Sequence, residues 1–215
     1  MSKPQGAVER KLGRPLDVDS AETRARLLKA ARGVFARDGY ARATNKTIAT
    51  AAGLTAGAIY YYYPSKAHLY VAVLEDVQHG VQQAYEKIAA EHTTLIDRFD
   101  ALLAYTVDVN KRDQTRASFI LGVHAEAQFN PELHRLLKEL RQRSTDVTAR
   151  LVSDAVERGE IAADVDPRAL QDLMKVIISG LRKLSAGRGR VERHANAVEL
   201  LRGVIAGKPI LAATE

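Results

Sequence analysis

The chain has 215 residues, of which 27% are charged and 46% apolar, and it contains neither cysteine nor tryptophan. This composition favours a globular protein of one large or two modest domains, and it excludes a disulfide framework, a thiolate metal site and a cysteine nucleophile. No apolar run approaches the roughly 18 residues that cross a bilayer, and the basic N-terminus lacks the apolar stretch of a secretory signal. We therefore expect a cytoplasmic protein.

The net charge of +6 is concentrated in the first third of the chain. Residues 1–70 carry 12 Lys and Arg against 5 Asp and Glu, whereas residues 71–215 carry 20 against 21. Six of the eight tyrosines also precede residue 71. A basic segment attracts polyanions because neutralised phosphates release counterions, but most charge runs are simply solvated surface. Charge alone leaves both interpretations open.

Residues 1–18 are rich in Pro, Gly and charge and lack periodicity, which predicts a flexible arm. Three of its basic residues surround a Gly-Arg-Pro step, and arginine is attracted into narrow minor grooves of DNA. The arm can therefore add a DNA contact, or it can be an ordinary weakly basic tail. The residues concerned are Arg10, Lys11 and Arg14.

Three helices are expected next, the last two of them short. Asp19 and Glu22 form a variant of the capping box at the start of the first helix, and Gly39 is a plausible left-handed stop. The second helix is capped by Thr44 and ends at Gly53. The third is capped by Thr55 and ends before Pro64. Two short helices joined by a tight connection predict a helix-turn-helix.

The third helix has the features of a recognition helix. Its first residues, Thr55, Ala56 and Gly57, have short side chains that allow close approach to base edges. Four consecutive tyrosines follow, and they cannot all be buried because neighbouring side chains differ by about 100° in direction. We expect Tyr63 or Ile59 in the core, with Tyr60 and Tyr62 facing DNA.

The remainder of the chain has helical periodicity, and no segment alternates for long enough to predict a strand. Ser65 can cap the next helix, and Asn130-Pro131 and Asp166-Pro167 can each open another. The expected helices span about 65–91, 94–111, 114–128, 131–158, 167–186 and 190–206. The predicted fold class is therefore all-α.

A longer pattern runs through the first helices, and it reads Gly39-Tyr40 … Thr44 … Ile48-Ala49 … Ala52-Gly53-Leu54-Thr55-x-Gly57-x-Ile59-Tyr60-x-Tyr62-Tyr63-Pro64-Ser65-Lys66-x-x-Leu69. In residue type and spacing, it resembles the DNA-binding domain of TetR-family transcriptional regulators over about residues 20–70. The resemblance implies a helix-turn-helix domain over residues 19–66 and an all-helical ligand-binding and dimerisation domain over residues 67–215. It also implies a bacterial repressor that leaves its operator when a small molecule binds.

Carried over position by position, the resemblance predicts a set of DNA contacts. The family often has a polar or basic residue at position 56, so Ala56 favours readout of DNA shape over direct hydrogen bonds. The predicted contacts are Thr44, Asn45, Lys46, Thr55, Ala56, Gly57, Tyr60, Tyr61, Tyr62 and Lys66.

The last two helices carry wide apolar stripes, which can serve both the core and a partner. The resemblance implies that they pair with a second copy in a four-helix interface, and a two-fold dimer reads two half-sites. The alternative is packing within one chain. The predicted interface residues are Leu170, Met174, Ile177, Ile178, Leu181, Val198, Leu201 and Ile205.

Residues 95–135 mix aromatic and polar side chains, as ligand pockets do. Candidate pocket residues are Phe99, Tyr105, Phe119, His124 and Phe129. His124 and Glu126 lie two apart on a helix and point to opposite sides, so they cannot chelate one metal. We expect no metal and no cofactor.

Two other classes remain as alternatives. A ligand-independent architectural DNA-binding protein would share the basic first third but would not need a large neutral helical domain. A helical-bundle enzyme is disfavoured because neither a phosphate-binding glycine loop nor a catalytic constellation is visible. We therefore predict a non-enzyme whose partners are operator DNA, a second copy and a small-molecule effector, with no membrane partner.

Overall fold

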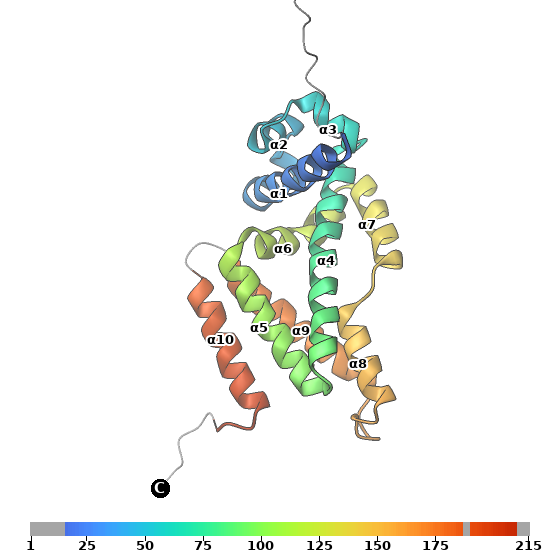
Figure 1. The fold of residues 1–215 in the computed structure, drawn as a ribbon, viewed down its shortest axis with the longest axis vertical. Helices are drawn as coiled ribbons and strands as arrows, with labels where there is room; N and C mark the ends of the chain where they lie inside the picture. Colours follow the sequence, from blue (N-terminus) through green and yellow to red (C-terminus); the bar gives the residue numbers. More distant parts are fainter. Residues whose placement is uncertain (1–15, 187–189, 210–215) are drawn as a thin grey trace, which may run out of the picture.

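The computed structural model describes residues 16–186 and 190–209, and Figure 1 shows them as an all-helical molecule. Within these residues the chain forms no strand, and no helix is both long and apolar enough to cross a membrane. The helices are α1 (Leu16–Arg42), α2 (Asn45–Ala52), α3 (Ala56–Tyr62), α4 (Lys66–Glu91), α5 (Leu95–Arg112), α6 (Thr115–Gln128), α7 (Pro131–Arg143), α8 (Val147–Glu157), α9 (Pro167–Ser185) and α10 (Val191–Ile205).

Local capping explains most of the helix ends. The side chains of Thr44, Thr55, Ser65 and Thr94 each accept a hydrogen bond from a backbone N–H in the first turn of the helix that follows. Gly53 closes α2 in the left-handed conformation, with φ 66° and ψ 36°. The predicted helix-turn-helix is therefore confirmed in its layout.

The first helix differs from the prediction at both ends. It includes Leu16, so Asp19 lies inside the helix and does not cap it, and the segment expected to be an arm overlaps the helix. Gly39 interrupts the helix with φ 75° and ψ 169°, after which the chain turns helical again as far as Arg42. A side chain at this glycine would collide with Glu126, whose Oε1 accepts a 2.8 Å hydrogen bond from the backbone N–H of Tyr40.

The single long helix expected over 131–158 is wrong, because the chain breaks between α7 and α8. Asp146 caps α8 by accepting hydrogen bonds from the N–H groups of Thr148 and Ala149. Before it, the hydroxyl of Ser144 donates to Gln78 Oε1 of α4 at 2.9 Å. Gly159, with φ 71°, follows α8 as predicted.

Two hydrophobic cores organise the molecule, and α4 contributes to both of them. The first core joins α1, α2, α3, the N-terminal half of α4, α6 and α7. The second core joins the C-terminal half of α4 with α5, α8, α9 and α10. Figure 1 shows α4 running down from the α1–α3 end through the length of the molecule. The division expected at residue 66 therefore does not coincide with a boundary between cores.

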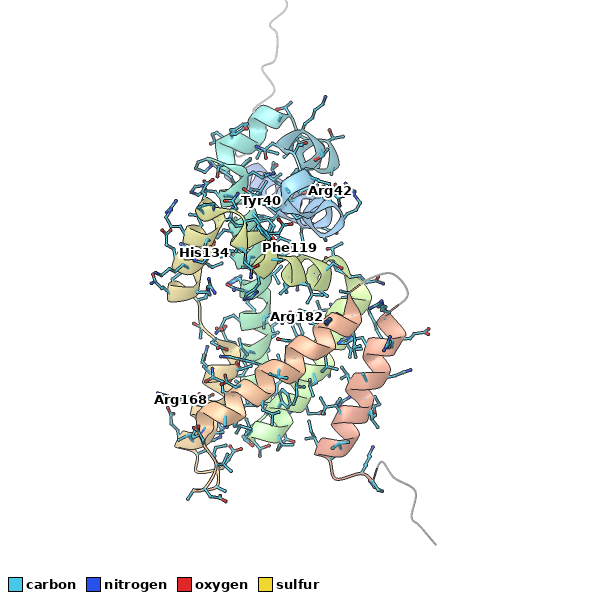
Figure 2. The ribbon with its side chains drawn as sticks, turned by 180° about the vertical axis from the view of Figure 1, so that it is seen from behind. Tyr40, Arg42, Phe119, His134, Arg168 and Arg182 are labelled. Atoms are coloured by element: carbon cyan, nitrogen blue, oxygen red, sulfur yellow. The ribbon has the colours of Figure 1, made fainter. Side chains whose placement is uncertain are left out.

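An aromatic cluster of Phe35, Tyr40, Tyr70 and Phe119 forms the centre of the first core. The ring of Tyr70 lies 4.8 Å from Phe35, 5.2 Å from Tyr40 and 4.8 Å from Phe119, measured between centroids. These distances are in the range of favourable aromatic pairs. Figure 2 shows Tyr40 and Phe119 close together at the junction of the two halves. The cluster thus packs α1 directly against α4 and α6.

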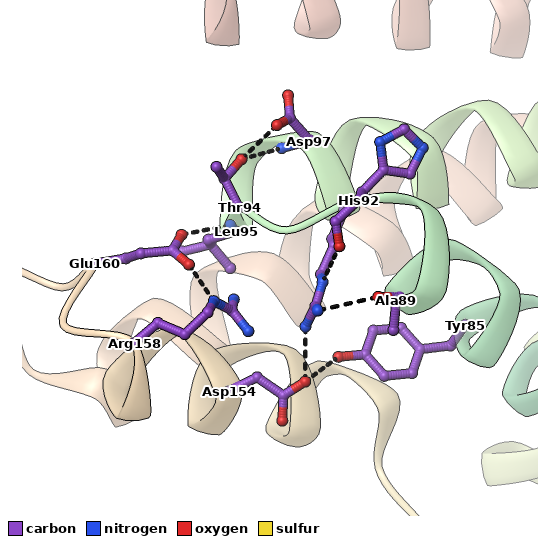
Figure 3. Close-up of polar contacts among 10 residues, drawn as sticks. Tyr85, Ala89, His92, Thr94, Leu95, Asp97, Asp154, Arg158 and Glu160 are labelled. Atoms are coloured by element: carbon purple, nitrogen blue, oxygen red, sulfur yellow. Dashed lines mark hydrogen bonds and ion pairs between the residues drawn. The ribbon is translucent and has the colours of Figure 1, made fainter.

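A buried arginine fixes the opposite end of the bundle, where α4, α5 and α8 meet. Arg98 donates to the carbonyl oxygens of His92 at 2.8 Å and Ala89 at 3.2 Å, and to Asp154 Oδ2 at 2.8 Å. Asp154 also accepts from the hydroxyl of Tyr85 at 3.1 Å (Figure 3). These bonds satisfy the last carbonyls of α4 and hold the second core closed.

Candidate DNA-binding surface and effector cavity

The helix-turn-helix presents an exposed face built from the N-terminal ends of α2 and α3. The side chains of Ile48, Ala52 and Ile59 are buried inside the motif, which fixes the two helices against α1. The predicted contact residues Thr44, Lys46, Thr55, Ala56 and Gly57 are exposed, and Asn45 is half-buried. Short side chains and free backbone N–H groups therefore face outward at the start of α3, which is the arrangement that phosphate and base edges require.

The four tyrosines divide between the core and the surface. Tyr63 is buried, together with Ile59, as expected. Tyr60 and Tyr61 are 60% and 83% exposed, whereas Tyr62 is half-buried and packs against the first core. The structure therefore favours Tyr60 and Tyr61 as the outward pair, in place of Tyr60 and Tyr62. Tyrosine hydroxyls at such positions can donate hydrogen bonds to DNA phosphates.

The half-buried side chain of Lys66 binds carbonyl oxygens at the C-terminal end of α1. Its ammonium donates to the carbonyl oxygens of Tyr40 at 2.7 Å and Ala43 at 2.9 Å, and it lies 4.3 Å from the centroid of the Tyr40 ring. Burial lowers the pKa of Lys66, against the opposing effect of Glu126. The sequence-based phosphate contact stays a prediction, but the geometry gives this lysine a structural role that the sequence did not indicate.

We expect Lys66→Met to lower the stability of the ligand-free protein by about 2 kcal/mol, which is roughly 5 °C in Tm for a chain of this size. The reason is that buried carbonyl oxygens of α1 would lose a charged donor. Thermal unfolding followed by circular dichroism measures this change, and Lys46→Met at an exposed position of α2 is the matched control. An unchanged Tm combined with weaker DNA binding would instead support a purely phosphate-binding lysine.

The predicted minor-groove contacts Arg10, Lys11 and Arg14 lie outside the described residues.

A cavity of about 540 Å³ lies between α4, α5, α6, α9 and the connection from α7 to α8, and a second chamber of about 80 Å³ shares part of its lining. The main volume is within the range of small-molecule sites. The residues common to both chambers are Val77, Val81, Tyr105, Thr106, Ile120, Ile178 and Arg182. The hydroxyl of Tyr105 donates to the carbonyl oxygen of Gly80 at 3.1 Å, which fixes its ring at the cavity wall.

Of the five pocket residues predicted from the sequence, only Tyr105 lines this cavity. Phe99 packs in the second core and Phe119 in the first, so both rings are surrounded by protein. His124 is exposed and Phe129 is 86% exposed, because both face solvent near the end of α6. The structure therefore does not bring these four residues to the lining of this cavity. The missed residues include Arg182, an arginine placed one helical turn after Ile178 on an apolar stripe, and that break in the stripe was the available signal.

Contacts at the junction of α5 and α6 join the cavity lining to α1. Asp113 lines the smaller chamber and forms an ion pair with Arg32 of α1. Arg32 also donates to Thr115 Oγ1 at 3.2 Å and lies 3.5 Å from Asp76 of α4. Although burial acts to raise the pKa of Asp113, hydrogen bonds from Thr115 and the charge of Arg32 outweigh it and hold that pKa below its usual range. A displacement of Asp113 at the wall of the smaller chamber would therefore act on α1 through Arg32.

An apolar surface remains on the outer faces of α9 and α10. Leu173 and Val176 of α9 are 56% and 67% exposed, and Leu200 and Val204 of α10 are also exposed. We call these four residues the outer apolar face. Gly180 follows on α9, and no atom lies within 4 Å of the position its Cβ would take.

Three of the predicted interface residues, Met174, Leu181 and Val198, are instead buried in the chain's own second core, so their prediction as interface residues is wrong. Each helix is apolar on two sides, and these three residues lie on the side that packs against the second core. The other predicted residues are partly buried against the same core, namely Leu170, Ile177, Ile178, Leu201 and Ile205.

Two family models match the chain. Residues 27–73 match the model described as bacterial regulatory proteins of the tetR family, and residues 90–180 match the tetracyclin repressor-like C-terminal domain. The two matches together cover the helix-turn-helix and most of the helices that surround the cavity.

Curated proteins and solved structures agree with these matches. The HTH-type transcriptional regulator UidR of Escherichia coli strain K12 is 25% identical over 197 residues, which is 89% of this chain and 95% of the relative. The HTH-type transcriptional repressor BepR of Brucella suis is 22% identical over 166 residues, or 75% and 79% of the two chains.

Among solved structures, Salmonella enterica GusR has a TM-score of 0.65 at 25% identity and covers 92% of this chain and 98% of its own. A TetR-family regulator from Rhodococcus sp. has the same fold, with a TM-score of 0.69 at 21% identity, covering 87% and 98%.

Proposed function

Because the chain belongs to the TetR family of bacterial transcriptional regulators, we propose that it is a dimeric repressor that binds operator DNA through α2 and α3 and releases it when a small molecule fills the cavity. The observation that carries the proposal is the link between the cavity and the helix-turn-helix, made by α4 and α6. Both helices line the cavity, and both pack against α1. Since operators lie on the bacterial chromosome, the protein acts in the cytoplasm.

Dimerisation is supported by the outer apolar face of α9 and α10. Exposed apolar residues on two neighbouring helices are stabilised when a second copy covers them, and Gly180 allows close approach of a partner helix. A two-fold dimer then places two copies of α3 on successive major-groove faces.

The mechanism is an equilibrium between two states of the dimer, which differ in the distance between the α1–α3 segments of the two copies. In the DNA-binding state the two α3 helices match the spacing of the half-sites. An effector between α4, α5, α6 and α9 displaces α6 and α4, and the displacement reaches α1 through the Arg32–Asp113 ion pair and the aromatic cluster around Tyr70. To empty an operator, the effector must bind the non-binding state more tightly by several kcal/mol.

Fluorescence anisotropy tests the proposal with the purified protein, the intergenic DNA beside its own gene and a scrambled duplex at two salt concentrations. We expect selective binding that weakens with salt, because phosphate contacts release counterions. Tyr60→Phe and Tyr61→Phe should each weaken operator binding about tenfold through a lost hydrogen bond, worth about 1.4 kcal/mol.

Tyr85→Phe is the matched control and should leave operator affinity unchanged, because the Tyr85 hydroxyl bonds Asp154 at the opposite end of the bundle, away from α3 and from the cavity. Equal binding of both duplexes would contradict a local regulator and favour an architectural role. Wild-type affinity in both tyrosine variants would remove these hydroxyls from the DNA contacts.

A further inference from the structure

A charged side chain without a protein partner lines the cavity. Arg182 lies on α9, below Phe119 in Figure 2, and it contributes to the walls of both chambers. Within residues 16–186 and 190–209, its guanidinium has no ion-pair partner and donates no hydrogen bond, and burial alone lowers its pKa. Arginine nevertheless remains charged in proteins, so the cavity contains a partly desolvated positive charge.

The acidic groups around the cavity are already committed to other partners. Asp113 is held by Arg32 and Thr115, as described above. Asp146 caps α8 and pairs with Lys175 at 2.8 Å. Burial acts to raise the pKa of Asp146, but hydrogen bonds from Lys175 and Thr148 outweigh it, so the net pKa is lowered and the carboxylate stays ionised. Neither carboxylate neutralises Arg182.

Two further groups strengthen the positive and polar character of this end of the cavity. Arg116 lines the smaller chamber beside Gly80, and no carboxylate of the described chain pairs with it. Asn110 lines the same chamber, and its buried Oδ1 has no hydrogen-bond partner among the described atoms. A buried polar group without a partner is unfavourable unless a ligand or water satisfies it. Aliphatic side chains, among them Val77 and Val81, supply an apolar part of the lining.

From this arrangement we propose that the effector is an organic acid, whose carboxylate pairs with Arg182 and whose apolar body fills the space between α4, α5, α6 and α9. The guanidinium presents paired N–H donors that match the two oxygens of a carboxylate. The inference rests on the proposed function, since it assigns the chemical class of the molecule that occupies the effector cavity. Arg182 is then the residue that selects for charge, and the aliphatic wall selects for shape.

The test uses a panel of alkanoic and arylacetic acids, each paired with its own primary amide, because the amide keeps the shape and removes the charge. Isothermal titration calorimetry on the full chain at neutral pH measures each pair. We expect acids that bind to do so at least about tenfold more tightly than their amides, a difference of 1.4 kcal/mol. Arg182→Met should reduce this ratio to about one, and Arg182→Lys should retain part of it.

Lys183→Met is the matched control, because Lys183 is exposed on the same helix and its loss should leave the acid preference intact. Circular dichroism and operator binding, measured on the same preparations, report whether each variant is folded. Amides that bind as tightly as acids, an acid preference that survives Arg182→Met, or no binding by any acid in the panel would overturn the inference. The proposed repressor function fails separately, by the absence of selective DNA binding in the wild-type protein.

Discussion

Val176→Glu is expected to convert the proposed dimer into a 23.6 kDa monomer and to weaken operator binding by about 100-fold or more. Val176 is 67% exposed in the single chain, so the substitution removes little packing from the monomer. In a dimer that buries the outer apolar face, however, the substitution would place an unpaired carboxylate within that face, which is strongly unfavourable. Loss of the second half-site contact then accounts for the loss of DNA affinity.

Light scattering after size-exclusion chromatography measures the mass, and anisotropy measures the affinity. Val156→Glu is the matched control, since Val156 is also an exposed valine but lies on α8, outside the outer apolar face. A Val176→Glu protein that remains dimeric and binds its operator normally would show that the copies associate through another surface.

Arg32→Met is expected to lower the free energy of unfolding by about 3 kcal/mol at neutral pH. Arg32 is 5% exposed, and it is the group that joins Asp113 to α1. Its removal leaves the Asp113 carboxylate partly buried without its ionic partner. In a double-mutant cycle, the variant Arg32→Met/Asp113→Asn should recover part of the loss, because it removes both charges of the pair.

The effect should also depend on pH in a defined direction. The folded-state pKa of Asp113 is lowered, so its pairing contributes fully above the ordinary Asp pKa of about 3.9 and is lost as pH falls through the lower folded value. Urea unfolding should therefore give a constant difference between wild type and Arg32→Met from neutral pH to about pH 5, and a smaller difference in more acidic solution. A difference that grows on acidification would contradict this role of the pair.

The sequence was informative wherever structure is decided within a few residues. Thr44, Gly53 and Thr55 specify the ends of α2 and α3 through contacts with their own neighbours, so the helix-turn-helix could be predicted. The break before α8 was missed because its signal is only the short polar run Ser144-Thr145-Asp146, with neither Gly nor Pro between two strongly helical segments.

The cavity could not be predicted in the same way, because its lining depends on which faces of distant helices meet. Phe99 and Phe119 are both aromatic residues in helices of the predicted pocket region, yet each packs in a different core. Arginine is a residue type usually found at the surface, and only the packing of α9 against α4, α5 and α6 places Arg182 at a cavity. Lys66 is a similar case, since its carbonyl partners lie more than twenty residues earlier in the chain.

The placement of α4 in both cores limits how this protein can be recombined. Phe35 and Tyr40 belong to the α1–α3 segment, which we call the reading head. They share one aromatic cluster with Tyr70 and Phe119, which follow this segment in the sequence. A chimera that joins this head to the body of another regulator at residue 66 would cut through that cluster and leave its rings facing foreign side chains. Exchange of DNA specificity among relatives is therefore easier by substitution on the exposed face of α3 than by transfer of the whole head, because those residues can vary without disturbing the packing beneath them.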